Sequence, residues 1–302
     1  MANLNLRSPF LGPQMSSKSV WLRGIAALMI VINALLLANW TVPKTYLYGV
    51  LRELAKANAL YKTQNLLMLE GQHFVVRYEP ENSGIAAMVL ENAESIYQPI
   101  ANAFGYQPKE KVNIIIYPTR AALNKSFGWE ADESAMGVYW AGVIRVLAPD
   151  QWIDSADQQE MSRIFASDGP MAHEFSHLVI DYRTRGNYPR WLTEGLAQYQ
   201  EYKLTGFRFT EPQGRLTGQL YAFKQMDKNF DYLPNQSLAY RQSLAAVQFL
   251  VEQYGDESLE KLLQELSAGV PLPKAIDSTI QLDLGSFEEV FTQWAKENVE
   301  RL

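Results

Sequence analysis

Two of the three histidines in this 302-residue chain lie four positions apart, in the segment HEFSH at residues 173–177. Residues i and i+4 share one face of an α-helix, so His173 and His177 can bind the same metal ion if the segment is helical. Glu174 follows the first histidine and borders the same site, where it can take a proton from water. The sequence therefore predicts a helix that carries part of a zinc site.

A catalytic zinc ion has three protein ligands and an open fourth position. The chain has no cysteine, so the third ligand must be a nitrogen or oxygen donor. Glu194 is the first candidate, because it lies in the first turns of the next predicted helix, after a loop long enough to fold that helix back. Asp181, Glu201 and Glu211 are the competing acids. His73 lies in a predicted strand far upstream and is expected to be structural.

The pattern along the chain predicts an α+β fold, in which a small mixed β-sheet precedes a mainly helical part that carries the site. Alternating and β-branched residues predict strands at 73–78, 112–117, 137–140 and 143–147, with helices at 85–104 and 121–127 between them. Prolines at the first turns, Pro170 and Pro189, begin the motif helix and the helix with Glu194. Later helices are expected at 235–254, 258–267 and 287–299, the last with a capping box of Ser286 and Glu289.

The N-terminal region contains a long segment without charge. Residues 24–40 read GIAALMIVINALLLANW, and the apolar stretch at 20–41 is long enough to cross a hydrocarbon layer of about 30 Å. We therefore predict a single-pass signal anchor at 20–41, a disordered cytoplasmic tail at 1–19 and an extracytoplasmic catalytic part. A cleaved signal peptide is the alternative, but a clean site of small residues is missing before Thr41.

Residues 42–70 are predicted to form an amphipathic stalk helix ahead of a metallopeptidase domain at 71–302. Apolar residues recur there at helical spacing, at Val50, Leu51, Leu54, Leu60, Leu66 and Leu67. The expected role of this helix is packing against the catalytic body. Contact with the membrane surface is the alternative.

Composition excludes several classes of protein. Hydrophobic residues make up 47% of the chain, enough for a sizeable core, which excludes a disordered or fibrous chain. The net charge is −6 and no basic patch or nucleic-acid motif is present, so no nucleic-acid partner is expected.

The segments HEFSH and WLTEGLAQY resemble the gluzincin metallopeptidases of the peptidase MA-like superfamily, which include the membrane alanyl aminopeptidases with their typical WLNEGFA. HEFSHLVIDY also resembles the first motif of thermolysin-like enzymes, HELTHAVTDY. The resemblance implies His173, His177 and Glu194 as ligands of one zinc ion and Glu174 as the general base. It implies a mainly helical zincin subdomain for the second half of the fold.

The same resemblance points to two further residues. The aminopeptidases have a downstream tyrosine that stabilises the oxyanion, and Tyr240 in AYRQSLAAVQFL has a similar position, although Gln242 and Ser243 replace the family's Lys-Gly. A tyrosine packed in the core is the alternative for Tyr240. Asp181 matches an acidic position of the thermolysin-like motif and is expected to support the site or the fold.

These features together predict a membrane-anchored zinc metallopeptidase that cleaves peptide or protein segments with zinc-activated water and Glu174 as base. The G-A-M-E-N loop that grips the free amine in aminopeptidases is absent, which favours an endopeptidase. Residues 143–147 are a candidate edge strand for pairing with an extended substrate, an ordinary sheet strand being the alternative. A catalytically silent module that binds partners or assembles complexes is the alternative function.

Overall fold

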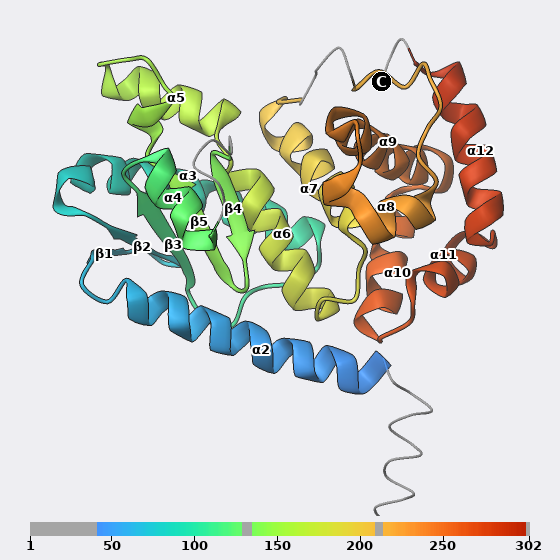
Figure 1. The fold of residues 1–302 in the computed structure, drawn as a ribbon, viewed down its shortest axis with the longest axis horizontal. Coiled ribbons are helices and arrows are strands. Elements are labelled where there is room, and N and C mark those ends of the chain that lie inside the picture. Colours follow the sequence, from blue (N-terminus) through green and yellow to red (C-terminus); the bar gives the residue numbers. More distant parts are fainter. Residues whose placement is uncertain (1–40, 129–134, 209–213, 300–302) are drawn as a thin grey trace, which may run out of the picture. The chain divides into compact units, whose positions relative to one another are not determined.

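The computed structural model describes residues 41–128, 135–208 and 214–299 (Figure 1). The predicted tail lies outside these residues, as does the predicted anchor except for its last position. Among the described residues, no helix combines the length and apolar character needed to cross a membrane. Residues from Thr45 onward form one compact unit, so the predicted boundary at residue 70 lies inside it.

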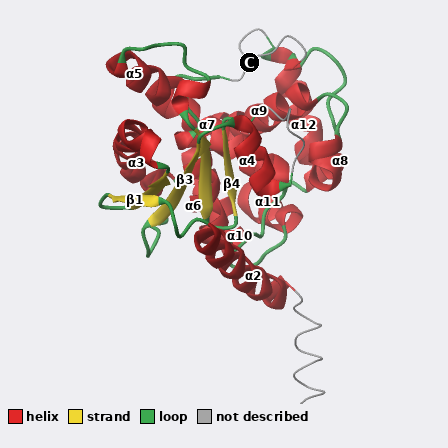
Figure 2. Ribbon diagram, turned by 60° about the vertical axis from the view of Figure 1, so that its left-hand side comes forward, coloured by secondary structure: helices red, strands yellow, loops and turns green. Residues whose placement is uncertain are grey.

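A five-stranded mixed sheet forms one part of this unit, as Figure 2 shows in yellow. Its order is β1-β2-β3-β5-β4, with bounds β1 Leu67–Glu70, β2 Phe74–Tyr78, β3 Val112–Tyr117, β4 Gly137–Trp140 and β5 Val143–Leu147. Strands β2, β3 and β5 are parallel, whereas β1 and β4 run antiparallel at the two edges. The predicted mixed sheet and its four strands are confirmed. β1 was not predicted, because its leucines continue the spacing of the preceding helix.

The helices are α2 Thr41–Lys62, α3 Ser83–Ala103, α4 Arg120–Phe127, α5 Gln158–Asp168, α6 Met171–Thr184, α7 Arg190–Thr205, α8 Phe223–Asn229, α9 Gln236–Tyr254, α10 Asp256–Ser267, α11 Leu272–Ile280 and α12 Leu284–Glu297. The small sheet followed by many helices confirms the α+β class. The predicted capping box of the last helix is wrong: Asp283 is the N-cap and accepts the backbone N–H of Ser286. A carboxylate at this position satisfies an amide that the first turn leaves unpaired.

Helix α6 lies at the centre of the unit, with the sheet on one side and α7 on the other (Figure 1). Most of its side chains are buried. Phe175 packs edge-on against Phe74 of β2, with ring centroids 5.1 Å apart, and stacks with Tyr97 of α3 at 5.4 Å. Truncating a fully buried phenylalanine of this kind typically costs about 3–5 kcal/mol. The motif helix is therefore held by the main core.

The other face of the sheet is covered in part by helix α2. Ile115 and Val143 form a small buried cluster with Ala59 near the end of α2, and Leu60 and Leu66 pack against it. The remaining apolar positions of the predicted stalk do not pack in this way. The exposed ones are Val50, Leu51, Leu54 and Leu67. Helix α2 thus packs against the catalytic body as expected, but most of its apolar face does not take part in this packing.

The strand at the edge beside the motif helix is β4. Residues Val143–Leu147 of β5 lie between β3 and β4 and are buried, so the prediction of an edge strand there is wrong. The backbone N–H of Leu147 donates to the carbonyl of Met136. Because antiparallel pairing alternates, the backbone groups of Gly137 and Tyr139 face the outer edge.

Candidate metal centre

The two helices of the site each begin directly after a proline. Helix α6 follows Pro170, and α7 follows Pro189, as predicted. Buried hydroxyls within α6 are satisfied by the helix itself, since Ser176 donates to the carbonyl of Ala172 at 2.7 Å. The short connection at residues 185–189 returns the chain, so that α7 packs along α6.

The close packing of α7 is made possible by a glycine in the second motif. A Cβ atom at Gly195 would lie 2.2 Å from the backbone carbonyl oxygen of Ser243 on α9. Any larger residue would therefore push α7 and α9 apart. This contact fixes the buried position of the neighbouring Glu194, of which only 1% is exposed.

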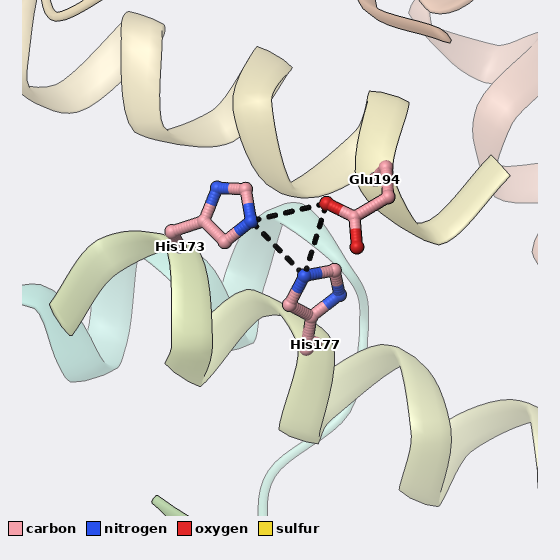
Figure 3. Close-up of side chains that lie close together, drawn as sticks. All are labelled: His173, His177 and Glu194. Carbon is pink, nitrogen blue, oxygen red and sulfur yellow. Dashed lines mark hydrogen bonds and ion pairs between the residues drawn. The ribbon is translucent and has the colours of Figure 1, made fainter. Parts of the chain in front are cut away.

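His173, His177 and Glu194 come together, as Figure 3 shows. The Nε2 atoms of the two histidines are 3.0 Å apart, and Glu194 Oε2 lies 3.3 Å from His173 Nε2 and 3.5 Å from His177 Nε2. Tetrahedral zinc with bonds of about 2.0–2.1 Å places its ligand atoms about 3.3–3.4 Å apart. Two nitrogens and one oxygen at these distances fit one zinc ion and leave a fourth position open.

The second nitrogen of each histidine also has a partner. His173 Nδ1 lies 3.1 Å from Glu201 Oε2, and His177 Nδ1 lies 2.8 Å from Thr193 Oγ1. Such contacts fix the ring orientation and direct Nε2 at the metal. Glu201, a competing ligand in the sequence, therefore lies behind His173 in this structure. Burial opposes protonation of His173, but Glu201 and Glu194 outweigh it and raise the pKa of His173 well above its usual value.

Glu194 is held from its other side by Arg190, one helical turn earlier on α7. Arg190 Nη2 lies 3.0 Å from Glu194 Oε1, which leaves Oε2 directed at the histidines. Burial alone would raise the pKa of Glu194. The charges of Arg190 and His177 outweigh burial and hold this pKa well below its usual value. The carboxylate is therefore ionised, as a zinc ligand must be.

Glu174 is buried and lies against the edge strand rather than against the ligand carboxylate. Its Oε2 accepts the backbone N–H of Tyr139 on β4 at 2.5 Å. Strand β4 comes this close because residue 137 is glycine: a Cβ there would lie 2.6 Å from Pro170 Cβ and 3.1 Å from Glu174 Cγ. The structure thus gives Glu174 a fixed orientation beside the edge strand of the sheet.

Tyr240 of α9 lies on the Arg190 side of the site. Its hydroxyl is hydrogen-bonded with the Arg190 guanidinium, and its ring packs edge-on against Phe230 with centroids 5.2 Å apart. The charge of Glu194, together with burial, raises the pKa of Tyr240 above its usual value. The hydroxyl is therefore protonated at neutral pH and is available as a donor.

Asp181 lies two helical turns beyond Glu174 on α6, and its hydrogen bonds go to residues other than the metal ligands. The side chain is fully buried. It accepts from Tyr139 Oη at 2.5 Å and Tyr48 Oη at 2.8 Å, and Arg52 Nη1 lies 3.2 Å away. Burial and the charge of Asp181 raise the pKa of Tyr139 well above its usual value, so this hydroxyl stays a donor. Asp181 thereby joins α6, β4 and α2.

His73 lies outside the cluster. Its Nδ1 is 2.7 Å from Glu94 Oε2, and its ring stacks on Tyr97 with centroids 3.7 Å apart. The competing acid Glu211 lies outside the described residues.

Three partners of the site were not predicted: Arg190, Thr193 and the Tyr139 amide. Arg190 is four residues before Glu194, so helical spacing was a usable signal for it. The Tyr139 amide could not be predicted, because a pattern of side chains does not show which backbone N–H groups will face a site.

The site consists of a histidine pair on one helix and a glutamate from the following helix. Comparison with known proteins agrees with this class of metal site. The family model described as "Peptidase MA superfamily" matches residues 93–297. The chain belongs to this superfamily. No curated protein matches.

Solved structures of low identity are similar to part of the chain. One is an M1 zinc metallopeptidase from Deinococcus radiodurans, with 14% identity, a TM-score of 0.35 and coverage of 76% of this chain. A mutant of that enzyme matches with 15% identity, a TM-score of 0.35 and coverage of 75%. In both cases this chain spans 50% of the length of the matched chain.

Proposed function

We propose that this protein is a membrane-anchored, zinc-dependent endopeptidase that acts outside the cytoplasm. The observation that carries the hydrolytic part is the three-ligand cluster with Glu174 beside it. His173, His177 and Glu194 leave one metal position open, and Glu174 Oε2 is oriented by the amide of Tyr139. This is the set of groups that metal-assisted hydrolysis of an amide requires.

Each residue of the site has a defined part in the reaction. Zinc, when bound, supplies a Lewis acid and lowers the pKa of a water molecule to about 7. Glu174 accepts the proton of the attacking water and then passes it to the leaving amine, as general base and general acid. The Tyr240 hydroxyl donates to the carbonyl oxygen as negative charge develops on it. Thr193 and Glu201 keep the two imidazoles in place.

The edge strand supports an extended substrate that continues on both sides of the cleaved bond. Strand β4 is the edge strand of the sheet, and the backbone groups of Gly137 face its outer edge, next to Glu174. A peptide that pairs with this edge gains main-chain hydrogen bonds along its length. No loop of the kind that grips a free amine is found in the sequence. These two features favour internal cleavage of peptide or protein segments.

Anchoring in a membrane is supported by the sequence at 24–40, which has no charged residue over a length close to a membrane span. The positive-inside bias is weak, but the lead-in before this segment fits a signal anchor with its tail in the cytoplasm and the metal centre outside. The HEFSH segment at 173–177 lies far along the chain from the apolar segment at 24–40. This separation favours hydrolysis in water over hydrolysis within the membrane.

The test is cleavage of a mixed peptide library by the full chain in detergent, with Glu174→Gln and Glu257→Gln as the variants. Glu257 is an exposed acid of α10 and serves as the matched control. We expect wild type and Glu257→Gln to cleave and Glu174→Gln to be inactive with its zinc retained. Turnover by Glu174→Gln would contradict the role of the base. One zinc per chain with no cleavage of any peptide would favour the non-catalytic module.

A further inference from the structure

Helix α2 presents its apolar side to solvent and its polar side to the protein. The outward side chains are Tyr46, Leu47, Val50, Leu51, Leu54 and Tyr61, which are 51–73% exposed. We call these six residues the outer face of α2. The inward positions carry mostly polar or small residues, with Thr45 and Ala59 buried, and Leu60 is the larger apolar residue that packs inward. A surface helix ordinarily has the reverse arrangement.

The orientation of α2 is fixed by polar contacts, of which those to Asp181 have a fully buried partner. Arg52 pairs with Asp181, whose side chain is fully buried, and stacks over the Tyr182 ring at 3.6 Å. Tyr48 donates to the same carboxylate at 2.8 Å, and Lys56 lies 2.9 Å from Glu110. Turning the helix to bury its leucines would remove the partners of Asp181. The outer face is therefore a stable feature of the surface.

We infer that the outer face of α2 lies in the interfacial layer of a lipid bilayer. This inference rests on the proposed anchoring, because the uncharged segment ends at Trp40, directly before the described residues of α2. The anchor thus holds the start of the helix at the membrane surface. Leucine and valine side chains gain by entering the boundary between headgroups and acyl chains.

The residues at the ends of the outer face fit the same environment. Tyr46 and Tyr61 lie near its two ends, and tyrosine favours the membrane–water boundary, where the ring is apolar and the hydroxyl is hydrated. Lys44 and Lys62 are exposed near the two ends of the helix and suit anionic headgroups. Helix α2 then lies along the membrane instead of standing upright as a stalk, and it holds the catalytic unit against the surface through Asp181.

The test uses the absence of cysteine from the chain. The full-length protein is made with single changes Leu51→Cys, Leu54→Cys or Val290→Cys, labelled with a nitroxide and reconstituted in vesicles of phosphatidylethanolamine and phosphatidylglycerol. Val290 is an exposed aliphatic residue of α12, 42% exposed, and serves as the matched control. Collision rates are measured with oxygen, which enters lipid, and with chromium oxalate, which stays in water. Zinc content checks that each variant is folded.

We expect the ratio of oxygen to chromium oxalate collisions to be severalfold higher at 51 and 54 than at 290. Equal ratios in vesicle-bound protein would overturn the inference, since the outer face would then be in water. Spin–spin broadening at 54 that disappears on dilution with unlabelled protein would also overturn it, in favour of a second copy of the chain. Failure of the protein to float with vesicles would overturn the proposed anchoring as well. Peptide cleavage, measured separately, reports on the peptidase activity alone.

Discussion

Tyr139 binds Glu174 through its backbone, and its side chain binds the same helix two turns further on. The amide donates to Glu174 Oε2 at 2.5 Å, while the hydroxyl donates to Asp181 Oδ2 at 2.5 Å. One residue of the edge strand is therefore fixed to α6 at two points. Tyr48 of α2 donates to the other oxygen of Asp181, Oδ1, and Arg52 of α2 shares Oδ2 with Tyr139. The position of α2 is therefore linked to the orientation of Glu174, the proposed general base.

Asp181→Asn is expected to lower kcat while changing KM little, since it weakens the support of Tyr139 without touching the metal ligands. Loss of the charge also leaves Arg52 with a poorer partner, for which we expect a loss of about 1.5–3 kcal/mol in the free energy of unfolding. Denaturant unfolding and steady-state kinetics measure the two effects. The control is Glu110→Gln. It breaks the exposed ion pair between Glu110 and Lys56 of α2, which should cost at most about 1 kcal/mol in the free energy of unfolding. Equal behaviour of the two variants would contradict the link.

Glu201→Gln is expected to weaken zinc binding about 10–100-fold without abolishing it, because Glu201 orients the His173 ring and is not itself a ligand. Competition with a chelator of known affinity measures the change, and Glu257→Gln provides the control. A protein that folds but no longer binds zinc would make Glu201 a ligand. Unchanged affinity would show that the contact with His173 Nδ1 is dispensable.

Tyr240→Phe is expected to lower kcat about 10²–10³-fold with zinc content unchanged, since the hydroxyl is assigned to the developing oxyanion. Because the pKa of Tyr240 is raised above its usual value, the hydroxyl keeps its proton through neutral and mildly alkaline pH. The wild-type rate should therefore show no loss from ionisation of Tyr240 between about pH 7 and 9. Tyr232→Phe, at a residue that is 88% exposed, is the control. An unchanged rate in Tyr240→Phe would assign this tyrosine to packing alone.

The sequence predicts the sheet and the cluster of His173, His177 and Glu194 well because both depend largely on local spacing. The strands at 112–117, 137–140 and 143–147 have the predicted bounds, since each is a short apolar or β-branched run closed by a turn or a proline. The histidine pair depends only on the geometry of one helix. Glu194 needs one further assumption, that α7 folds back on α6, and the loop length supports it.

Features that depend on tertiary packing were predicted less well. The periodicity of α2 identifies an apolar face, but it does not tell which face the protein buries, and the buried pair of Arg52 with Asp181 decides that question. The edge position of β4 follows from strand order, which a single sequence does not contain. Glu201 has the same local signature as a ligand, and only its position behind His173 distinguishes the two roles.

The most direct test of the metal centre is zinc content, measured by mass spectrometry on the purified full chain and on Glu194→Gln and Glu174→Gln. The site described here predicts one zinc per chain in the wild type and in Glu174→Gln, and a strong loss in Glu194→Gln at equal folding. A folded wild type without metal would contradict the centre itself. Unchanged zinc in Glu194→Gln would contradict the assignment of its third ligand.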